Sequence, residues 1–372
     1  MKRVVFFAVN SKQRKFFERI ANYLGKGSRV VYSGTLFFPS WRAFGRMAEV
    51  DLSAPIRLRV RDFIAKYGCA GCAPLIALWY KVLAWWAYLR YFDTLEQNDD
   101  VLVVWNGVLF RQAIMLQVAR SKGLMPLFVE TGLLPGRITV DPAGVNFKNS
   151  VPRMRTFFEN YDNPKPLPDT LIPRAPKNAK KFASLHKEPL PDRYIFVPFQ
   201  VDYDTQILVY SPWIQNMRHL FSVIEEVVDA VPELHFVFKE HPSSIKSYPD
   251  LHTRAASHPR LMFANAYATQ TLIENAEAVI TVNSTVGVES LLFGKRVVVL
   301  GDAFYAIEGI CKHAQNREQL KRILEDLHGW QPDLTLIEKF LKYLYYDYQI
   351  DGNFDEANPR QLEKIAAMIA RL

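Results

Sequence analysis

Apolar strand patterns alternate with helix patterns along the whole chain, and this alternation constrains the fold more than any other feature. The first half contains four short apolar runs, each followed by a turn or a polar helix start: Val4–Val9, Ser28–Tyr32, Val101–Trp105 and Pro126–Val129. Four more strand patterns follow later, at Tyr194–Val201, His235–Lys239, Ala278–Val282 and Arg296–Leu300. Helix-like segments lie among these later strands, at Trp213–Val231, Thr269–Asn275 and Val286–Phe293. Strands that alternate with helices predict an α/β fold with parallel sheets.

The two series of strands are separated by a proline- and lysine-rich stretch, residues 163–190, which holds few large apolar side chains and predicts a linker. A length of 372 residues also favours two domains. We therefore expect two Rossmann-like domains, residues 1–185 and 186–345, whose parallel sheets face a central cleft. The C-terminal helical segment, 346–372, is a candidate to pack on the first domain.

Composition is that of an ordinary soluble protein, with 49% apolar and 23% charged residues, and the first residues do not resemble a signal peptide. The three cysteines, Cys69, Cys72 and Cys311, are too few for a disulfide framework and favour a reducing cytoplasm. Cys69 and Cys72 have CxxC spacing, but no second pair or histidine cluster completes a zinc site. We interpret them as two buried thiols.

Positive charge is concentrated at the N-terminal end. Residues 1–92 hold 16 Lys and Arg against four acids, a balance of +12, whereas the remaining 280 residues carry 30 basic and 34 acidic side chains. This asymmetry indicates an anionic partner. Nucleic acid is one candidate, but no nucleic-acid motif accompanies the charge, so we expect none to bind. An anionic membrane surface fits better.

Residues 72–92 are almost wholly apolar and aromatic, and Lys81 and Arg90 are their only charges. The length is close to the roughly 20 residues of a membrane span, but Pro74 and Lys81 disfavour spanning. Four of the seven tryptophans fall between residues 41 and 86, near Arg57 and other cations. Tryptophan beside cations is typical of a helix that lies in the membrane interface, which predicts peripheral contact with an anionic membrane. A core helix of the first domain explains the same pattern equally well.

Acidic residues follow one predicted strand in each half, at the end where α/β folds place their ligands. Glu130 opens the polar, glycine-rich stretch Glu130-Thr-Gly-Leu-Leu-Pro-Gly136, which Asp141-Pro-Ala-Gly-Val-Asn146 follows. Asp202 and Asp204 follow the strand that begins at Tyr194. Structural alternatives exist for both places, because Glu130 or Asp204 can simply cap the next helix.

Two further strand ends offer groups that bind phosphate. Lys239, His241 and Pro242 place a cation and an imidazole beside a predicted helix start with free N–H groups. A surface turn is the plainer alternative for this His-Pro pair.

Asn283, Ser284 and Thr285 follow another strand and open a helix that contains Glu289. Hydroxyl and N–H groups at such a helix start bind phosphate, and Glu289 can accept hydrogen bonds from ribose hydroxyls. An ordinary capped helix is the alternative here. The order of strand, hydroxyls, acid, glycine and strand makes this the most specific of the sites.

The His241-Pro242 and Ser284-Thr285 motifs resemble those with which CMP-sugar-dependent glycosyltransferases of the GT-B fold bind the CMP phosphate. The stretch from Glu130 to Asn146, with Asn149-Ser-Val-Pro-Arg153 after it, is similar to the retaining β-Kdo glycosyltransferases of the capsule polysaccharide and O-antigen biosynthesis family. Together these motifs span about residues 100–310.

The resemblance implies transfer of Kdo from CMP-Kdo to a saccharide or glycolipid acceptor, with retention, by double displacement. Asp204 would be the nucleophile, with Asp202 as the competing candidate, and Glu130 the acid/base. His241, with Lys239 near it, would offset charge on the departing phosphate. Ser284 and Thr285 would bind that phosphate, next to Pro242 and Asn283, and Glu289 would hold the ribose.

No DxD-like motif lies beside the phosphate motifs, so neither a metal nor a cofactor is expected. The cytoplasm, or the cytoplasmic face of the inner membrane, is the expected location. Three alternatives stay open: a GT-B transferase with a different nucleotide sugar, a nucleotide-sugar epimerase, and a non-catalytic capsule export or assembly protein. Binding of CMP but not UDP distinguishes the CMP-Kdo-dependent transferase from these alternatives.

Overall fold

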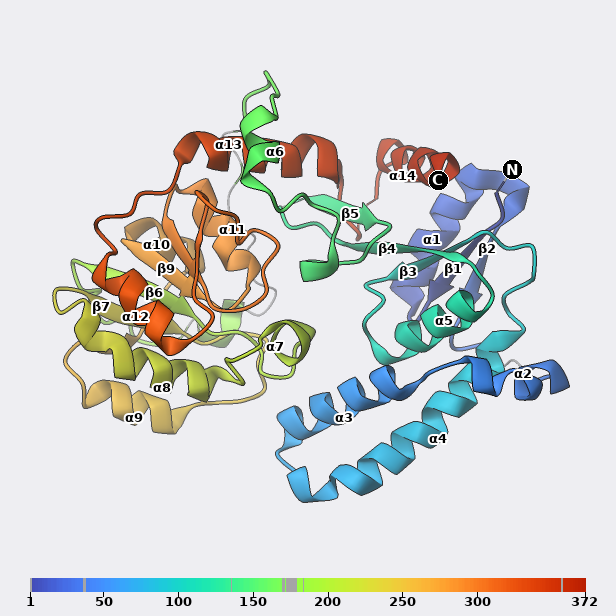
Figure 1. The fold of residues 1–372 in the computed structure, drawn as a ribbon, viewed down its shortest axis with the longest axis horizontal. Coiled ribbons are helices and arrows are strands. Elements are labelled where there is room, and N and C mark those ends of the chain that lie inside the picture. The colour runs from blue at the N-terminus through green and yellow to red at the C-terminus, as the bar shows by residue number, and fades with distance from the viewer. Residues whose placement is uncertain are drawn as a thin grey trace. The chain divides into compact units, whose positions relative to one another are not determined.

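The computed structural model describes residues 2–35, 38–134, 136–168, 171, 179–182, 184–355 and 357–372. Within them the chain forms two compact units, residues 1–150 with 346–372, and residues 151–345 (Figure 1). The sequence placed the domain boundary at residue 185, but α6 (Arg155–Asn160) packs on α13 (Leu334–Lys342) inside the second unit. Within the predicted linker, 163–190, residues 169, 170, 172–178 and 183 lie outside the described residues.

The first unit is built on a six-stranded sheet of order β12-β5-β4-β3-β1-β2. Its elements are β1 (Val4–Ala8), α1 (Ser11–Leu24), β2 (Ser28–Tyr32), α2 (Trp41–Gly45), α3 (Ser53–Tyr67), α4 (Ala73–Phe92), β3 (Val101–Trp105), α5 (Phe110–Ser121), β4 (Met125–Thr131), β5 (Arg137–Asp141), β12 (Gln349–Asp351) and α14 (Pro359–Arg371). Strands β2, β1, β3 and β4 pair in parallel, whereas β5 and β12 add an antiparallel edge that the sequence did not predict. Such edges are common on otherwise parallel sheets.

Alternate residues of β1 enter two different cores, because successive side chains of a strand point to opposite faces of the sheet. Val5 and Phe7 join the core under α4 and α5, and Val4 and Phe6 join the core under α1 and α14. Both faces of the sheet are therefore covered, and α14 packs on α1.

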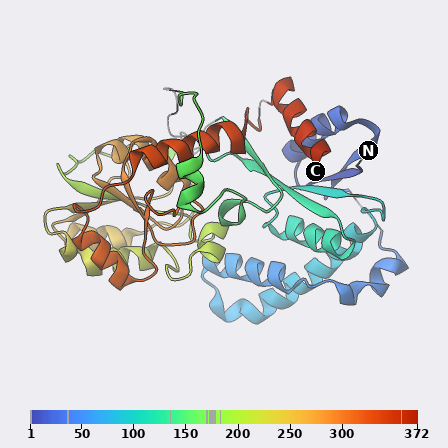
Figure 2. The same ribbon diagram turned by 45° about the horizontal axis from the view of Figure 1, so that its top comes forward.

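Helices α3 and α4 form an antiparallel hairpin whose tip lies away from the sheet of its unit (Figures 1 and 2). At the tip Cys69 and Cys72 are joined in a disulfide and half-exposed. The prediction of two buried thiols was therefore wrong, because the apolar sequence around them does not belong to the core. Because two of the three cysteines form this disulfide, the number of cysteines no longer favours a reducing cytoplasm. The cytoplasmic location stays a prediction.

The second unit has a six-stranded sheet of order β11-β10-β9-β6-β7-β8, in which every pairing is parallel. Besides α6 and α13 its elements are β6 (Tyr194–Pro198), α7 (Thr205–Tyr210), α8 (Met217–Val227), β7 (His235–Lys239), α9 (Pro249–Ala256), β8 (Leu261–Phe263), α10 (Thr269–Asn275), β9 (Ala278–Thr281), α11 (Thr285–Leu292), β10 (Arg296–Val299), β11 (Lys312–His313) and α12 (Arg317–Glu325). Helices α8, α9 and α12 cover one face, and α10 lies on the other. All eight strands predicted from the sequence are present.

Candidate active site

The residues predicted to bind a nucleotide follow β6, β7 and β9, which are direct neighbours in the second sheet. Because the three strands are parallel, their carboxyl ends meet at one edge. The tertiary structure therefore brings together side chains from three separate parts of the chain.

Asp204 is the exposed carboxylate at this edge and the N-cap of α7. Its Oδ1 accepts a hydrogen bond from the Gln206 N–H at 2.8 Å. The capping alternative is thus correct, yet the cap uses only one of the two carboxylate oxygens. While Asp204 caps α7 through Oδ1, its second carboxylate oxygen can still act on a ligand.

Asp202 lies two residues earlier and is 3% exposed. Its Oδ1 accepts from the Met217 N–H at 2.7 Å, and its Oδ2 accepts from Lys246 Nζ at 3.1 Å and from the Tyr248 hydroxyl at 3.2 Å. Both oxygens therefore hold the loop after β6 to α8 and to the segment before α9. This geometry separates two acids that the sequence left as competing candidates.

His241 is half-buried and neighbours Asp204. Burial lowers the pKa of the His241 imidazole, and the Asp204 carboxylate opposes this shift without cancelling it. The Nδ1 atom accepts a hydrogen bond from the Ser243 N–H at 3.1 Å. In the neutral ring the proton is then on Nε2, which becomes a donor for an anionic ligand.

The expected helix start at Pro242 is wrong. His241–Ser244 form a turn, closed by the Ser244 N–H to His241 carbonyl bond at 3.0 Å, and the next helix, α9, begins only at Pro249. The surface-turn alternative is correct for the backbone, so His241 contributes its side chain without a helix terminus behind it.

Lys239 is buried, and its Nζ donates to the carbonyls of Asn265 and Tyr267, each at 2.7 Å. Burial lowers the pKa of Lys239 to about 8. The sequence placed this amine beside the phosphate, but in the structure two of its N–H groups bind the loop after β8.

Asn283, another predicted ligand, is 2% exposed and links three elements. Its Oδ1 accepts from Gln200 Nε2 at 2.9 Å, and its Nδ2 donates to the carbonyls of Gln206 and Tyr210 at 2.9 and 2.8 Å. The Gln200 Oε1 in turn accepts from the Asn283 N–H at 3.1 Å. Asn283 therefore positions α7 against the start of α11.

The start of α11 presents small hydroxyl residues, as predicted. Ser284 is the N-cap, its Oγ accepting from the Val286 N–H at 3.2 Å, and Thr285 is exposed. The hydroxyl of the fully buried Tyr305 donates to the Ser284 carbonyl at 2.5 Å. A Cβ at Gly287 would lie 2.3 Å from that hydroxyl, so only glycine admits the tyrosine. Sequence reasoning missed Tyr305, although Gly287 inside the helix was a signal of close packing.

Glu289 lies one turn into α11 and is 9% exposed. Its carboxylate interacts with Tyr305, whose pKa is raised chiefly by burial, with smaller contributions from Cys311 and Glu289. Glu289 thus lies near the α11 start, but deeper than Ser284 and Thr285.

Glu130, in the first unit, lies at the end of β4. Its Oε2 accepts from Asn106 Nδ2 at 2.7 Å and its Oε1 from the Thr131 N–H at 2.8 Å. Burial raises the pKa of Glu130 despite these hydrogen bonds. Asn106, which directly follows β3, has a positive φ of 64°. A raised pKa is the property that a proton-transfer carboxyl needs.

Asp141, in the same motif, has a structural role. It is fully buried and accepts hydrogen bonds from the N–H groups of Ala143 and Ser150, both at 2.7 Å, and from the Tyr348 hydroxyl at 2.8 Å. It therefore fixes the 143–150 loop and the segment that leads into β12. Pro135, also part of the motif, lies outside the described residues.

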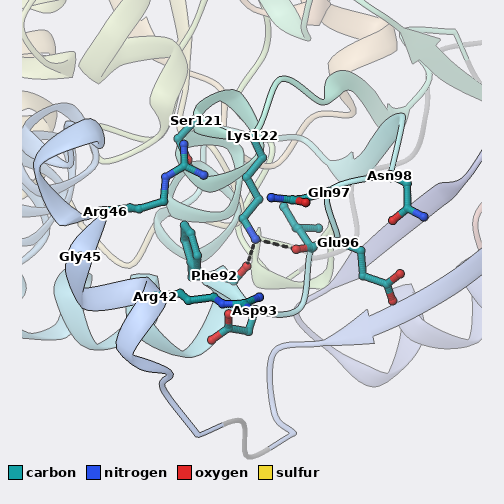
Figure 3. Close-up of a pocket in the computed structure, with 11 residues that line it drawn as sticks. Arg42, Gly45, Arg46, Phe92, Asp93, Glu96, Gln97, Asn98, Ser121 and Lys122 are labelled. Atoms are coloured by element: carbon teal, nitrogen blue, oxygen red, sulfur yellow. Dashed lines mark hydrogen bonds between the residues drawn. The ribbon is translucent and has the colours of Figure 1, made fainter.

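A hollow of about 1010 Å³ lies in the first unit, away from Glu130, and Arg42, Arg46 and Lys122 are its cations (Figure 3). Lys122 Nζ donates to the carbonyls of Phe92 and Leu95, and Arg46 pairs with Glu49. Two of the three cations are thus already engaged, and none of the predicted site residues lines the hollow.

Within the described residues no three His, Cys, Asp or Glu side chains gather where they would hold a metal ion. The expectation that no metal is needed stays a prediction.

Residues 175–355 match the model of the family described as capsule polysaccharide biosynthesis protein. The predicted resemblance to the capsule polysaccharide biosynthesis family is confirmed over these residues, which make up slightly less than half of the chain. Protein FixF of Sinorhizobium fredii is 37% identical over 274 residues, which cover 72% of this chain and 65% of FixF. The capsule polysaccharide export protein KpsS of Escherichia coli is 25% identical over 63% of this chain and 74% of its own length. The chain therefore spans slightly less than two thirds of FixF.

Among solved structures, the chain resembles KpsC of Thermosulfurimonas dismutans, described as a β-Kdo 2,7-transferase. The TM-score is 0.51 and the identity 15%, over 100% of this chain and 99% of that one. At this identity the likeness concerns the fold alone, and together with the two α/β units it confirms the predicted GT-B fold class.

Proposed function

We propose that the protein is a glycosyltransferase of bacterial surface polysaccharide synthesis, which moves Kdo from CMP-Kdo to a saccharide or glycolipid acceptor with retention. The observation that carries the proposal is that an exposed carboxylate, Asp204, and a half-buried imidazole, His241, whose pKa is lowered by burial, follow neighbouring strands at the sheet edge where α11 also begins. The family match and the KpsC-like fold support the substrate class.

In the proposed first step, a carboxylate oxygen of Asp204 bonds to the anomeric carbon of Kdo while the bond from that carbon to the phosphate oxygen breaks. CMP leaves as a phosphate monoester with the bonding electrons. The Nε2–H of His241, together with the hydroxyl and N–H groups at Ser284 and Thr285, donates to its oxygens. Glu289 is proposed to bind the ribose.

In the second step, an acceptor hydroxyl bonds to the same carbon, its proton passes to the carboxylate of Glu130, and Asp204 is released. Two inversions at one carbon preserve the configuration. The raised pKa of Glu130 makes its ionised form a stronger proton acceptor. Lys239 and Asn283 receive positioning roles in this scheme, because their polar atoms bind other parts of the second unit. The reaction is proposed to need neither a metal nor a cofactor.

The test is a nucleotide screen followed by a transfer assay. CMP should raise the thermal unfolding midpoint and UDP should not, and CMP-Kdo should be converted to CMP when acceptor polysaccharide is present. Stabilisation by UDP alone would favour a different nucleotide sugar. No stabilisation by any nucleotide would favour an assembly or export protein, the role that the name of KpsS carries.

A further inference from the structure

Helix α4 exposes an apolar face that nothing in the described structure covers. Leu75, Leu78, Trp79, Val82 and Trp86 recur at helical spacing, so they share one side of α4, and all five side chains are exposed, Leu75 by 73% and Trp79 by 62%. We call these five residues the α4 stripe.

The opposite side of the same helix anchors it. Ala84, Tyr88 and Tyr91 are buried and belong to the core that α4 shares with α5. The segment Ala70–Phe92 is long and apolar enough to span a membrane, and only 22% of its most apolar window is buried. The core-helix alternative thus accounts for one face of α4 but leaves the stripe unexplained, and exposed apolar surface of this kind marks an interaction site.

The α3–α4 hairpin that carries the stripe is rich in cations. Residues 53–92 contain six Lys and Arg and a single acid, Asp62, which pairs with Arg59. Arg57 and Arg61 lie four residues apart and therefore share one side of α3, while Lys81 lies on α4. These three are exposed and, in the part of the chain that the structure describes, form no ion pair.

We propose that the α3–α4 hairpin binds the surface of an anionic phospholipid membrane and lies in its interface. The α4 stripe enters the boundary between headgroups and acyl chains, where tryptophan rings are favoured, and Arg57, Arg61 and Lys81 contact the phosphates. Charge selects this occupant over a second copy of the chain, because two hairpins with six cations and one acid each repel one another. The proposal does not depend on the donor nucleotide, since Asp204 and His241 belong to the other unit.

Co-sedimentation of the full chain, without nucleotide, with phosphatidylcholine vesicles and with vesicles containing phosphatidylglycerol tests the proposal. Binding should require phosphatidylglycerol and should fall as salt rises. The double variant Arg57→Gln/Arg61→Gln should bind roughly fivefold more weakly per charge removed. Trp79→Ser/Trp86→Ser should lose most of the binding, yet unfold at nearly the wild-type temperature, because both rings are largely exposed.

Matched controls come from exposed residues outside the hairpin: Leu334→Ser for the stripe and Lys364→Gln for the cations. Both should bind vesicles as the wild type does. Equal binding to the two vesicle types, or wild-type binding by both hairpin variants, would overturn the proposal.

The depth of the tryptophan rings in the bilayer gives a further test of the proposal. Tryptophan fluorescence should be quenched more by lipids brominated near the headgroup than by lipids brominated deep in the acyl chain. Stronger quenching from deep bromines would indicate a spanning helix and overturn the interfacial proposal. A stable dimer in solution that Trp79→Ser/Trp86→Ser dissociates would overturn it in favour of self-association.

Discussion

The pair Asp204→Asn and Asp202→Asn separates chemistry from structure at neighbouring positions. An Asn at position 204 keeps an oxygen that accepts the Gln206 N–H, and Asn caps helices about as well as Asp. The free energy of unfolding should therefore change by less than about 0.5 kcal/mol. The nucleophile is lost, so turnover of CMP-Kdo should fall on the order of a thousandfold or more.

Asp202→Asn should have the reverse effects, with a clear loss of stability and little loss of turnover. The charge that holds Lys246 and Tyr248 disappears from a nearly fully buried site. Asn has one accepting oxygen where Asp has two, so it can accept from the Met217 N–H or from Lys246 and Tyr248, but not from both sides. Hydrogen bonds to a charged group contribute roughly 1.5–3 kcal/mol each, and Lys246 is partly exposed, so a loss of about 2 kcal/mol is expected. Activity per folded molecule should stay within about tenfold of the wild type, because this carboxylate does not take part in the proposed chemistry.

The assay measures CMP release from CMP-Kdo and thermal unfolding on the same protein preparations. Wild-type CMP release by Asp204→Asn would refute the assignment of the nucleophile. Loss of turnover in Asp202→Asn at unchanged stability would transfer that role to Asp202.

Four further predictions concern the remaining site residues. Glu130→Gln should allow a Kdo–enzyme adduct to accumulate, visible as added mass in intact-protein spectra and absent when Asp204→Asn is combined with it. In the wild type the transfer rate should fall on acidification at a pH above the ordinary Glu pKa of about 4.3. The reason is that the proton acceptor must be ionised, and burial raises the pKa of Glu130. His241→Ala and Ser284→Ala should each weaken CMP binding by roughly 1–3 kcal/mol in calorimetry, and unchanged affinity in both would refute this phosphate site. Asn283→Ala should lower the unfolding temperature as well as CMP affinity, since it removes three side-chain hydrogen bonds of a buried residue; an effect on affinity alone would make Asn283 a direct ligand.

The sequence by itself determined the α/β architecture and which strand ends carry the candidate site residues. Buried parallel strands are continuous apolar runs that end in polar residues, so β6, β7 and β9 and the residues after them can be predicted from the sequence. The antiparallel edge was not visible, because β5 and β12 are paired by contacts about 200 residues apart in the chain.

Only the tertiary structure decided what each of these polar residues contacts. Asp202 and Asp204 are the same residue type two positions apart, and they differ because Lys246 and Tyr248, more than 40 residues later, fold onto one of them. Asn283 likewise became a positioning residue through Gln200 and the carbonyls of α7. The apolar pattern of α4 was equally consistent with a core helix and with an interfacial helix. The fold buried one side of α4 and left the other exposed, because burial depends on which elements a helix meets, and hydrophobic periodicity does not encode that.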